Sequence, residues 1–277
     1  MPSSLCVSIV VYRPDMALLG ASLRSLGIAL ANAHGQAALA HCEVVVVDND
    51  AAAAGAAPVQ SALATALDDR GGWLTHQLIE SPGNVGYGAA NNLAISASRA
   101  DYHLVMNPDV VLDPDAISAA LAFMEHAPHV ALLSPLAADP EGARQYLCKR
   151  YPSLWVLFLR GFGPRALQRL FAHDLARYEM RDETADRYAG RFLASGCFML
   201  MRRDVLRKVG GFDPGFFMYF EDYDLSMRIA RHAELAFVPA VRIVHYGGNA
   251  AGKGWRHRRL FLRSALRFFH VHGWRLV

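Results

Sequence analysis

Short apolar runs alternate with helically spaced apolar positions along the first half of the chain. The runs are rich in Val and Ile, and this predicts buried β-strands at residues 5–12, 43–47, 74–80 and 102–106. Leu and Ala at helical spacing predict helices at residues 15–32, 87–98 and 115–126, and a weaker helix after a loop within 51–67. Strands that alternate with helices indicate an α/β fold with a parallel sheet covered on both faces.

The second half of the chain is less regular. Residues 139–191 are rich in Arg, Tyr, Phe and Leu and contain Pro152 and Pro164, which predicts an irregular or helical insertion. Strand character returns at 192–202, a short helix is predicted at 220–231, and two short strands are predicted at 235–238 and 242–245. The last predicted helix, 256–270, has one apolar side formed by Leu260, Phe261, Ala265, Phe268 and Phe269.

Composition narrows the class of protein. Hydrophobic residues make up 53% of the 277 residues and charged residues 19%, which predicts a sizeable core and excludes general disorder. We find neither an N-terminal signal-peptide pattern nor an apolar run of the about 20 residues that a membrane span needs. The cysteines form no CxxC pair, which argues against a disulfide scaffold or zinc ribbon and favours the cytoplasm: Cys6, Cys42, Cys148 and Cys197.

Positive charge is concentrated at the C-terminal end. The net charge is +3, yet residues 247–277 hold seven Lys or Arg and no acidic residue, so the rest of the chain carries −4. Such a basic segment suggests contact with an anionic surface, either phospholipid or nucleic acid. A solvated helical face explains the same charges.

Several polar residues follow predicted strands. Tyr12, Asp48 and Asp109 each end or follow a strand, and the carboxyl ends of parallel strands share one edge, where ligands bind. Asp109 and His245 together suit a site for Mg²⁺ or Mn²⁺, completed by phosphate oxygens. Asp222 follows an aromatic-rich stretch that would raise the pKa of its carboxyl, as a general base requires, although helix capping also explains an acid there.

An ordered set of motifs resembles a known family. The motifs are VSIVVY at 7–12, VVVVDND at 44–50, PGNVGYGAANN at 82–92, NPDV at 107–110, GGFDPGFFMYFEDYDLSMR at 210–228 and VHYGG at 244–248. Over about residues 5–250 the chain resembles the family 2 inverting glycosyltransferases with a GT-A fold, and most of all their rhamnosyltransferase branch. The resemblance implies a catalytic domain at about 1–250 and a basic amphipathic tail at 251–277. That domain would comprise a nucleotide-binding half (about 1–110) and an acceptor half (about 111–250, with the insertion at about 139–191).

The resemblance also implies roles for individual residues. Val11 and Tyr12 would contact the nucleobase, Asp48 its imide, and Asn84 and Gly86 would line the nucleotide-sugar pocket.

The same resemblance implies the metal ligands and the catalytic base. Asp109, the last residue of the Asp-x-Asp motif, and His245 would hold the metal, and Asp222 would be the catalytic base. Asn107 stands in the nucleotide-sugar site where many relatives have Asp, which removes one negative charge. Further contacts to diphosphate or acceptor are expected from Glu221, Lys253 and Arg256.

The resemblance also implies a donor, an acceptor, a cofactor and a cellular location. The expected donor is dTDP-rhamnose, with a UDP-hexose as the alternative, and the expected cofactor is Mg²⁺ or Mn²⁺. The expected acceptor is a saccharide on polyprenyl diphosphate, used to build bacterial cell-surface polysaccharides such as lipopolysaccharide. The enzyme would be cytoplasmic and peripheral on the inner face of the inner membrane, with its basic helix on lipid, on the protein body or on a second copy in a homo-oligomer.

Three other classes explain fewer of these features. An NAD-dependent oxidoreductase would use Gly83-x-x-Gly86-x-Gly88, but this is not GxGxxG and follows the third predicted strand. A nucleotidyltransferase would need a Gly-rich basic loop after the first strand. A nucleic-acid-binding module rests on the basic tail alone and leaves the carboxylates without a role, so we expect no nucleic-acid partner.

Overall fold

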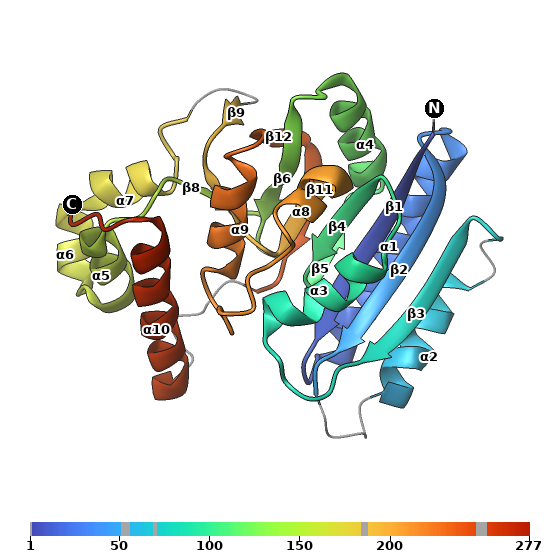
Figure 1. Cartoon of the computed structure of the whole chain (residues 1–277), viewed down its shortest axis with the longest axis horizontal. Coiled ribbons are helices and arrows are strands. Elements are labelled where there is room, and N and C mark those ends of the chain that lie inside the picture. Colours follow the sequence, from blue (N-terminus) through green and yellow to red (C-terminus); the bar gives the residue numbers. More distant parts are fainter. Residues whose placement is uncertain (1, 51–55, 69–70, 184–187, 248–253) are drawn as a thin grey trace.

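A mixed β-sheet forms the centre of the protein (Figure 1). The computed structural model describes residues 2–50, 56–68, 71–183, 188–247 and 254–277. Within them the main sheet has ten strands in the order β3-β2-β1-β4-β11-β6-β12-β5, with β7 beside β6 and β9 beside β12, while β8 and β10 pair separately. The strands are β1 Ser3–Val11, β2 Leu39–Asp48, β3 Leu74–Glu80, β4 Tyr102–Met106, β5 Val110–Leu112, β6 Val130–Ala138, β7 Arg144–Gln145, β8 Cys148–Lys149, β9 Tyr188–Gly190, β10 Leu193–Ala194, β11 Phe198–Arg202 and β12 Glu234–His245.

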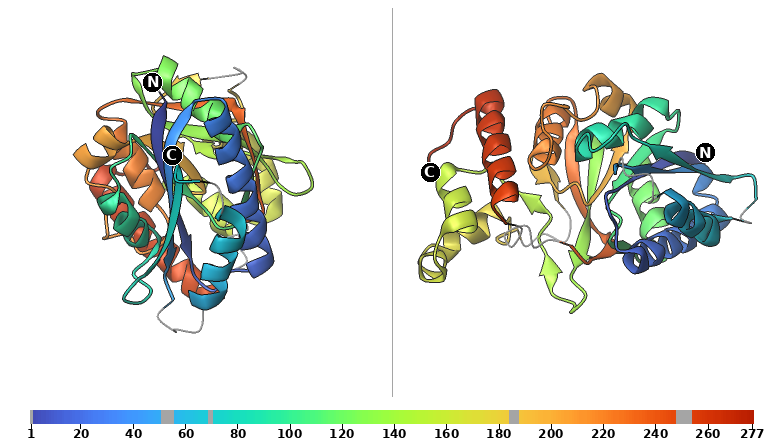
Figure 2. Two further views of the ribbon diagram at one scale, coloured as in Figure 1. Left: turned by 90° about the vertical axis from the view of Figure 1, so that its right-hand side faces the viewer. Right: turned by 90° about the horizontal axis from the view of Figure 1, so that it is seen from below.

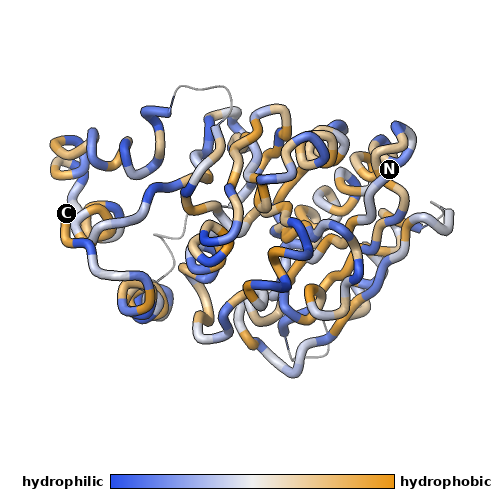
Figure 3. The backbone as a smooth tube through the Cα atoms, turned by 45° about the horizontal axis from the view of Figure 1, so that its top comes forward, coloured by the Kyte–Doolittle hydropathy of each residue, from blue (hydrophilic) through white to orange (hydrophobic). Residues whose placement is uncertain are grey.

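Helices cover both faces of this sheet. They are α1 Met16–Gly35, α2 Ala56–Leu67, α3 Tyr87–Ala97, α4 Ala116–His126, α5 Leu154–Phe162, α6 Arg165–Leu170, α7 Ala172–Tyr178, α8 Arg203–Lys208, α9 Glu221–Ile229 and α10 Gly254–His272. Alternate strand residues pack against α1, α2 and α4 on one face and against α3, α8 and α9 on the other. The central strands β1, β4 and β11 are therefore largely apolar and buried (orange in Figure 3), and the expected α/β architecture is confirmed.

The first four strands explain the placement of the polar strand ends. β1 pairs in parallel with β2 and with β4, with Val11 opposite Asp48 and Ile9 opposite Met106, and β3 pairs in parallel with β2. Tyr12, Asp48 and Asn107 therefore lie at one edge of the sheet. The sequence predicted this edge for Tyr12, Asp48 and Asp109, and Asp109 follows Asn107 by two residues, just before β5. β11 then runs antiparallel between β4 and β6, which makes the sheet mixed.

Several elements differ from the sequence-based expectation. The two short strands expected at 235–238 and 242–245 are one strand, β12, which pairs with β6 on both sides of an irregularity between Val238 and Arg242. Pro239 lies in this gap, where a residue without an N–H is tolerated. The expected helical insertion contains α5, α6 and α7 but also the short strands β7, β8 and β9, and the sequence pattern did not reveal β5, β6 or α8.

One helix is long and apolar enough to cross a membrane. α1 passes this test, although the sequence run was judged too interrupted to span. Half of its apolar window is buried in the protein, with Leu19, Leu23, Leu26 and Leu30 in the core cluster. A core helix passes the same test of length and composition, so this feature is weak evidence for a membrane span.

The C-terminal helix lies beside the helical insertion. Figures 1 and 2 place α10 and α5–α7 together at the end of the molecule away from β3. Ala265, Phe268 and Phe269 of α10 are buried in a cluster with Leu157 and Phe220. The apolar side that the sequence assigned either to lipid or to the body therefore packs against the body.

A buried hydrogen bond joins α10 to α9. His272 Nε2 lies 2.8 Å from Asp224 Oδ1, both side chains are almost fully buried, and Arg228 holds the other oxygen of Asp224. We expect His272→Ala to lower the free energy of unfolding by about 1–3 kcal/mol, because a buried carboxylate oxygen loses its partner. Thermal unfolding measures this effect, with His270→Ala, at an exposed position of the same helix, as the control. Equal midpoints for the two variants would contradict the prediction.

Candidate active site

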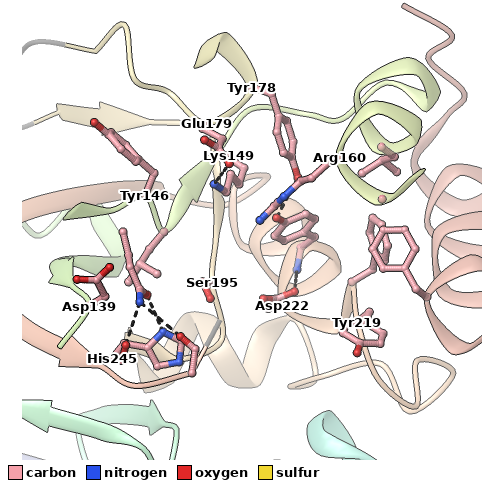
Figure 4. Close-up of a pocket in the computed structure, with 18 of the residues that line it drawn as sticks. Asp139, Tyr146, Lys149, Arg160, Tyr178, Glu179, Ser195, Tyr219, Asp222 and His245 are labelled. Carbon is pink, nitrogen blue, oxygen red and sulfur yellow. Dashed lines mark hydrogen bonds and ion pairs between the residues drawn. The ribbon is translucent and has the colours of Figure 1, made fainter. Parts of the chain in front are cut away.

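A cavity of about 890 Å³ opens between the sheet and the helical insertion (Figure 4). Its walls come from β7, β8, α5, α7, the first turn of α9, the end of β12 and α10. Asp222, Glu221 and His245 all line it. A cavity of this volume suits a small-molecule substrate.

Asp222 lies in the first turn of α9 and is held by backbone amides. Its Oδ2 accepts the N–H of Gly196 at 2.8 Å and its Oδ1 accepts the N–H of Tyr223 at 2.9 Å. The turn before it is strained, since Tyr219 and Phe220 adopt left-handed backbone angles with φ of 70° and 65°. Strain of this kind in residues other than glycine concentrates at functional sites.

Burial separates the pKa values of two adjacent carboxyls. It raises the pKa of Asp222 to about 6, and burial together with the charge of Asp222 raises the pKa of Glu221 to about 8. Glu221 Oε2 is buried without a hydrogen-bond partner among the described residues. Near neutral pH the pair therefore consists of an ionised Asp222 beside a protonated Glu221, and such divergent values are typical of acid–base sites.

Asp109 and His245 meet where β5 pairs with the end of β12. Asp109 Oδ1 lies 3.6 Å from His245 Nε2, and His245 Nδ1 lies 2.8 Å from Gln145 Oε1. The amide nitrogen of Gln145 donates to the backbone carbonyl of His245, which fixes the Gln145 oxygen as the group that faces Nδ1. Nδ1 therefore carries the proton and donates it to this oxygen, and the lone pair of Nε2 faces Asp109. A Cβ on Gly247 would lie 2.4 Å from Asp109 Oδ2, so the chain approaches this carboxylate closely.

The pair fits a divalent cation such as Mg²⁺ or Mn²⁺. Asp109 Oδ1 is buried and has no hydrogen-bond partner in the described part of the chain. Burial lowers the pKa of His245, which favours the neutral imidazole that metals bind. The described residues contain no group of three or more His, Cys, Asp or Glu that could hold a metal, so substrate oxygens and water would supply the other ligands.

The predicted nucleotide-binding residues lie along the sheet edge, outside the lining of this cavity. Val11 and Asp48 are buried, and Asp48 Oδ1 accepts the N–H of Asp50 at 3.0 Å, whereas Tyr12 is 46% exposed. The side chain of Asn84 accepts from the Asn49 amide at 3.2 Å. Asn107, after β4, donates its N–H to the carbonyl of Cys197.

Gly86 has a structural reason to be glycine. Its φ is +93°, and a Cβ there would lie 2.4 Å from the carbonyl oxygen of Phe217. Asn49, which sequence reasoning missed, orders the same loop by accepting from Ser81 and from the N–H of Val85, both at 3.0 Å. Lys253 lies outside the described residues, and so does the side chain of Arg256.

Sequence reasoning also missed a basic cluster in the cavity wall. Lys149, Arg160, Tyr178 and Glu179 line the cavity together with Asp222. They belong to β8, α5 and the end of α7, which the sequence described only as an irregular or helical insertion.

The sequence matches a known family and several curated proteins. The family model described as "Glycosyl transferase family 2" matches residues 23–210. The chain is 32% identical over 192 residues to N-acetylglucosaminyl-diphospho-decaprenol L-rhamnosyltransferase of Mycobacterium tuberculosis, covering 64% of this chain and 61% of that protein. It is 28% identical over 178 residues to the rhamnosyltransferase WbbL of Escherichia coli strain K12, covering 60% and 62%. The chain thus spans about three fifths of these relatives.

Solved structures share the fold. A structure of GalNAc-T7 with UDP, GalNAc and Mn²⁺ superposes with a TM-score of 0.65 at 15% identity, covering 98% of this chain and 48% of that one. The mannosyltransferase PcManGT of Pyrobaculum calidifontis, in complex with GDP-Man and Mn²⁺, gives 0.58 at 17% identity, covering 97% and 62%. These likenesses establish the GT-A fold.

Proposed function

The chain belongs to glycosyltransferase family 2, and we propose that it moves rhamnose from dTDP-rhamnose to a saccharide on polyprenyl diphosphate, with inversion, during synthesis of bacterial cell-surface polysaccharide. Both curated relatives are named as rhamnosyltransferases, which supports rhamnose as the transferred sugar. The name of the mycobacterial relative includes a diphospho-decaprenol, which supports a lipid-linked acceptor. The observation that carries the proposal is an amide-held carboxylate with a raised pKa, Asp222, in one cavity with His245, which in turn faces Asp109.

The residues divide the reaction between them. Asp222 accepts the proton of the acceptor hydroxyl while that oxygen bonds to the anomeric carbon and the bond to the donor diphosphate breaks. Glu221 stays protonated and therefore adds no second negative charge beside the base. Asp109 and His245 would hold the divalent cation, which when bound neutralises charge on the leaving diphosphate. The strand-end residues Tyr12 and Asp48 would hold the nucleobase.

A donor and acceptor screen tests the function. The purified chain is incubated with Mg²⁺ or Mn²⁺, an N-acetylglucosamine acceptor on a short-chain lipid diphosphate, and either dTDP-rhamnose, UDP-glucose or GDP-mannose. We expect mass spectrometry to detect a rhamnosylated product only with the first donor. Transfer from UDP-glucose instead would favour the alternative of a UDP-hexose donor, and release of nucleotide without glycoside formation would contradict the proposal.

The pH dependence of turnover should report the raised pKa of Asp222. The base must be ionised, so kcat should fall about tenfold per pH unit below about pH 6, rather than below the ordinary value near 4. Glu221→Gln should keep this acid limb and remove any inflection near pH 8, because the ionisation of Glu221 is absent. Full activity at pH 4.5 would contradict the assignment.

The exposed side of α10 supports a peripheral position of the protein on the membrane. Trp255, Leu262 and Leu266 are exposed there, at helical spacing with the exposed Arg259. Apolar side chains flanked by arginine suit an interface with anionic lipid, where each basic residue contributes about 1 kcal/mol. More exposed apolar residues lie on neighbouring helices: Phe158 and Phe162 on α5 and Leu170 on α6.

Vesicle flotation tests this membrane position. With vesicles rich in anionic phospholipid, we expect the double variant Leu262→Gln/Leu266→Gln to lose most of the bound fraction. Ile28→Gln is the matched control, because Ile28 is equally exposed on α1. Wild-type flotation of the double variant would remove lipid as the partner of this surface.

A further inference from the structure

A surplus of positive charge lies in the cavity wall next to Asp222. Lys149 is almost buried, and its Nζ lies 3.3 Å from Glu179 Oε1. Glu179 also pairs with Arg181, at 2.6 Å between Nη2 and Oε2, so one carboxylate serves two cations. Arg160 has no acidic partner within 4.0 Å in the described part of the protein. The cluster therefore carries more positive than negative charge.

Two tyrosines connect this cluster to Asp222. Lys149 Nζ lies 5.7 Å and Arg160 Cζ lies 5.9 Å from the centroid of the Tyr178 ring. The hydroxyl of Tyr178 is 3.1 Å from that of Tyr223, whose N–H donates to Asp222. Figure 4 shows Arg160 and Tyr178 pointing into the part of the cavity that holds Asp222. An anion bound between the cations would share this cavity with the substrate hydroxyl that Asp222 deprotonates.

This cluster is separate from the pair expected to hold the donor diphosphate. Asp109 and His245 lie where β5 meets the end of β12, whereas Lys149 and Arg160 come from β8 and α5. Burial and the charge of Arg160 lower the pKa of Lys149 to about 8, so a bound anion would stabilise its ammonium. Apolar side chains line the cavity beside Arg160 and would accommodate a hydrocarbon chain: Leu157, Phe162 and Phe261.

We propose that Lys149 and Arg160 form a subsite for the diphosphate of the acceptor, with the adjoining apolar wall receiving the start of its lipid chain. This inference rests on the proposed function, because it assigns the second substrate of the same reaction. Arginine and lysine bind phosphate oxygens through charge-assisted hydrogen bonds, and two cations match the charge of a diphosphate. The subsite would make transfer selective for diphosphate-linked acceptors over neutral glycosides carrying the same sugar.

The test compares two acceptors that carry the same sugar, one on a lipid diphosphate and one on a neutral alkyl chain. Arg160→Gln should raise KM for N-acetylglucosamine on a short-chain lipid diphosphate by about 10–100-fold with little change in kcat, as loss of a charge-assisted bond predicts. KM for the neutral octyl glycoside of the same sugar, and KM for the donor, should stay unchanged. Arg160→Lys should restore part of the effect, and Arg165→Gln, which removes an exposed arginine on α6, should have none. Equal losses on both acceptors, or none on either, would overturn the subsite.

A binding measurement keeps the subsite testable on its own. Inorganic pyrophosphate is titrated calorimetrically into wild type, Arg160→Gln, Lys149→Gln and the control Arg165→Gln, in EDTA so that no divalent cation contributes. We expect weaker binding in the first two variants and wild-type binding in the third. If wild type transfers sugar to neither acceptor, the proposed function fails while this measurement still decides the subsite. Pyrophosphate binding that both cation variants leave intact would refute it.

Discussion

Asp222→Asn is expected to lower the rate of sugar transfer by at least about 10²–10⁴-fold, the range typical for loss of a general base. Asparagine keeps the volume of the side chain, but it cannot take up a proton, and its single oxygen can accept only one of the two N–H groups, of Gly196 and of Tyr223, that Asp222 accepts. The chemical step should therefore fail, and a thermal-unfolding midpoint close to that of wild type would show that the α9 turn tolerates the lost hydrogen bond. Because Asp222 lies away from the strand-end residues assigned to the nucleobase, affinity for the donor nucleotide should change little.

The adjacent carboxyl provides the matched control. Glu221 has a pKa raised to about 8 and is protonated at pH 7, so Glu221→Gln replaces one neutral group by another of the same shape. Single-turnover kinetics at pH 7 should give Glu221→Gln a rate within about tenfold of wild type and Asp222→Asn almost none. Calorimetry with dTDP should give similar affinities for all three proteins. A reversed order of the two rates would move the base to Glu221.

The first four strands of the sheet could be predicted from the sequence because local patterns determine them. β1, β2, β3 and β4 are short apolar runs that each end in polar residues, and their parallel pairing follows from the helices between them. β6 was missed because its sequence VALLSPLAA contains a proline and mostly Leu and Ala, which predict a strand poorly. β12 was read as two strands because its bulge interrupts the pattern.

Some residues of the candidate site could be predicted from the sequence, and others could not. Asp109, Asp222 and His245 each stand in a motif, so the resemblance identified them, but only the structure places Asp109 3.6 Å from His245. Gln145 is 100 residues from His245, and Gly196 is 26 residues from Asp222, in segments without a family motif. Lys149 and Arg160 become a candidate pair only because both line one cavity and both face the ring of Tyr178. Contacts between segments so far apart in the sequence cannot be predicted from the spacing of residues along the chain.

Asp109→Ala should abolish the dependence of nucleotide binding on a divalent cation. Asp109 offers a buried, unpartnered oxygen toward His245, and the alanine variant removes the one carboxylate of this pair. Loss of a residue that only orients a metal ligand typically weakens metal affinity by about 10–100-fold, so loss of a direct ligand should cost at least as much. Gln145→Ala, which frees only the far nitrogen of His245, should fall within that smaller range.

Calorimetric titration of dTDP with and without Mn²⁺ measures this dependence. We expect Mn²⁺ to tighten binding to wild type, to have no effect on Asp109→Ala, and to have a reduced effect on Gln145→Ala. Asp204→Ala, which removes an exposed carboxylate on α8 outside the cavity, should behave as wild type. A Mn²⁺ effect of wild-type size that survives in Asp109→Ala would contradict the assignment of Asp109 as a ligand of the cation.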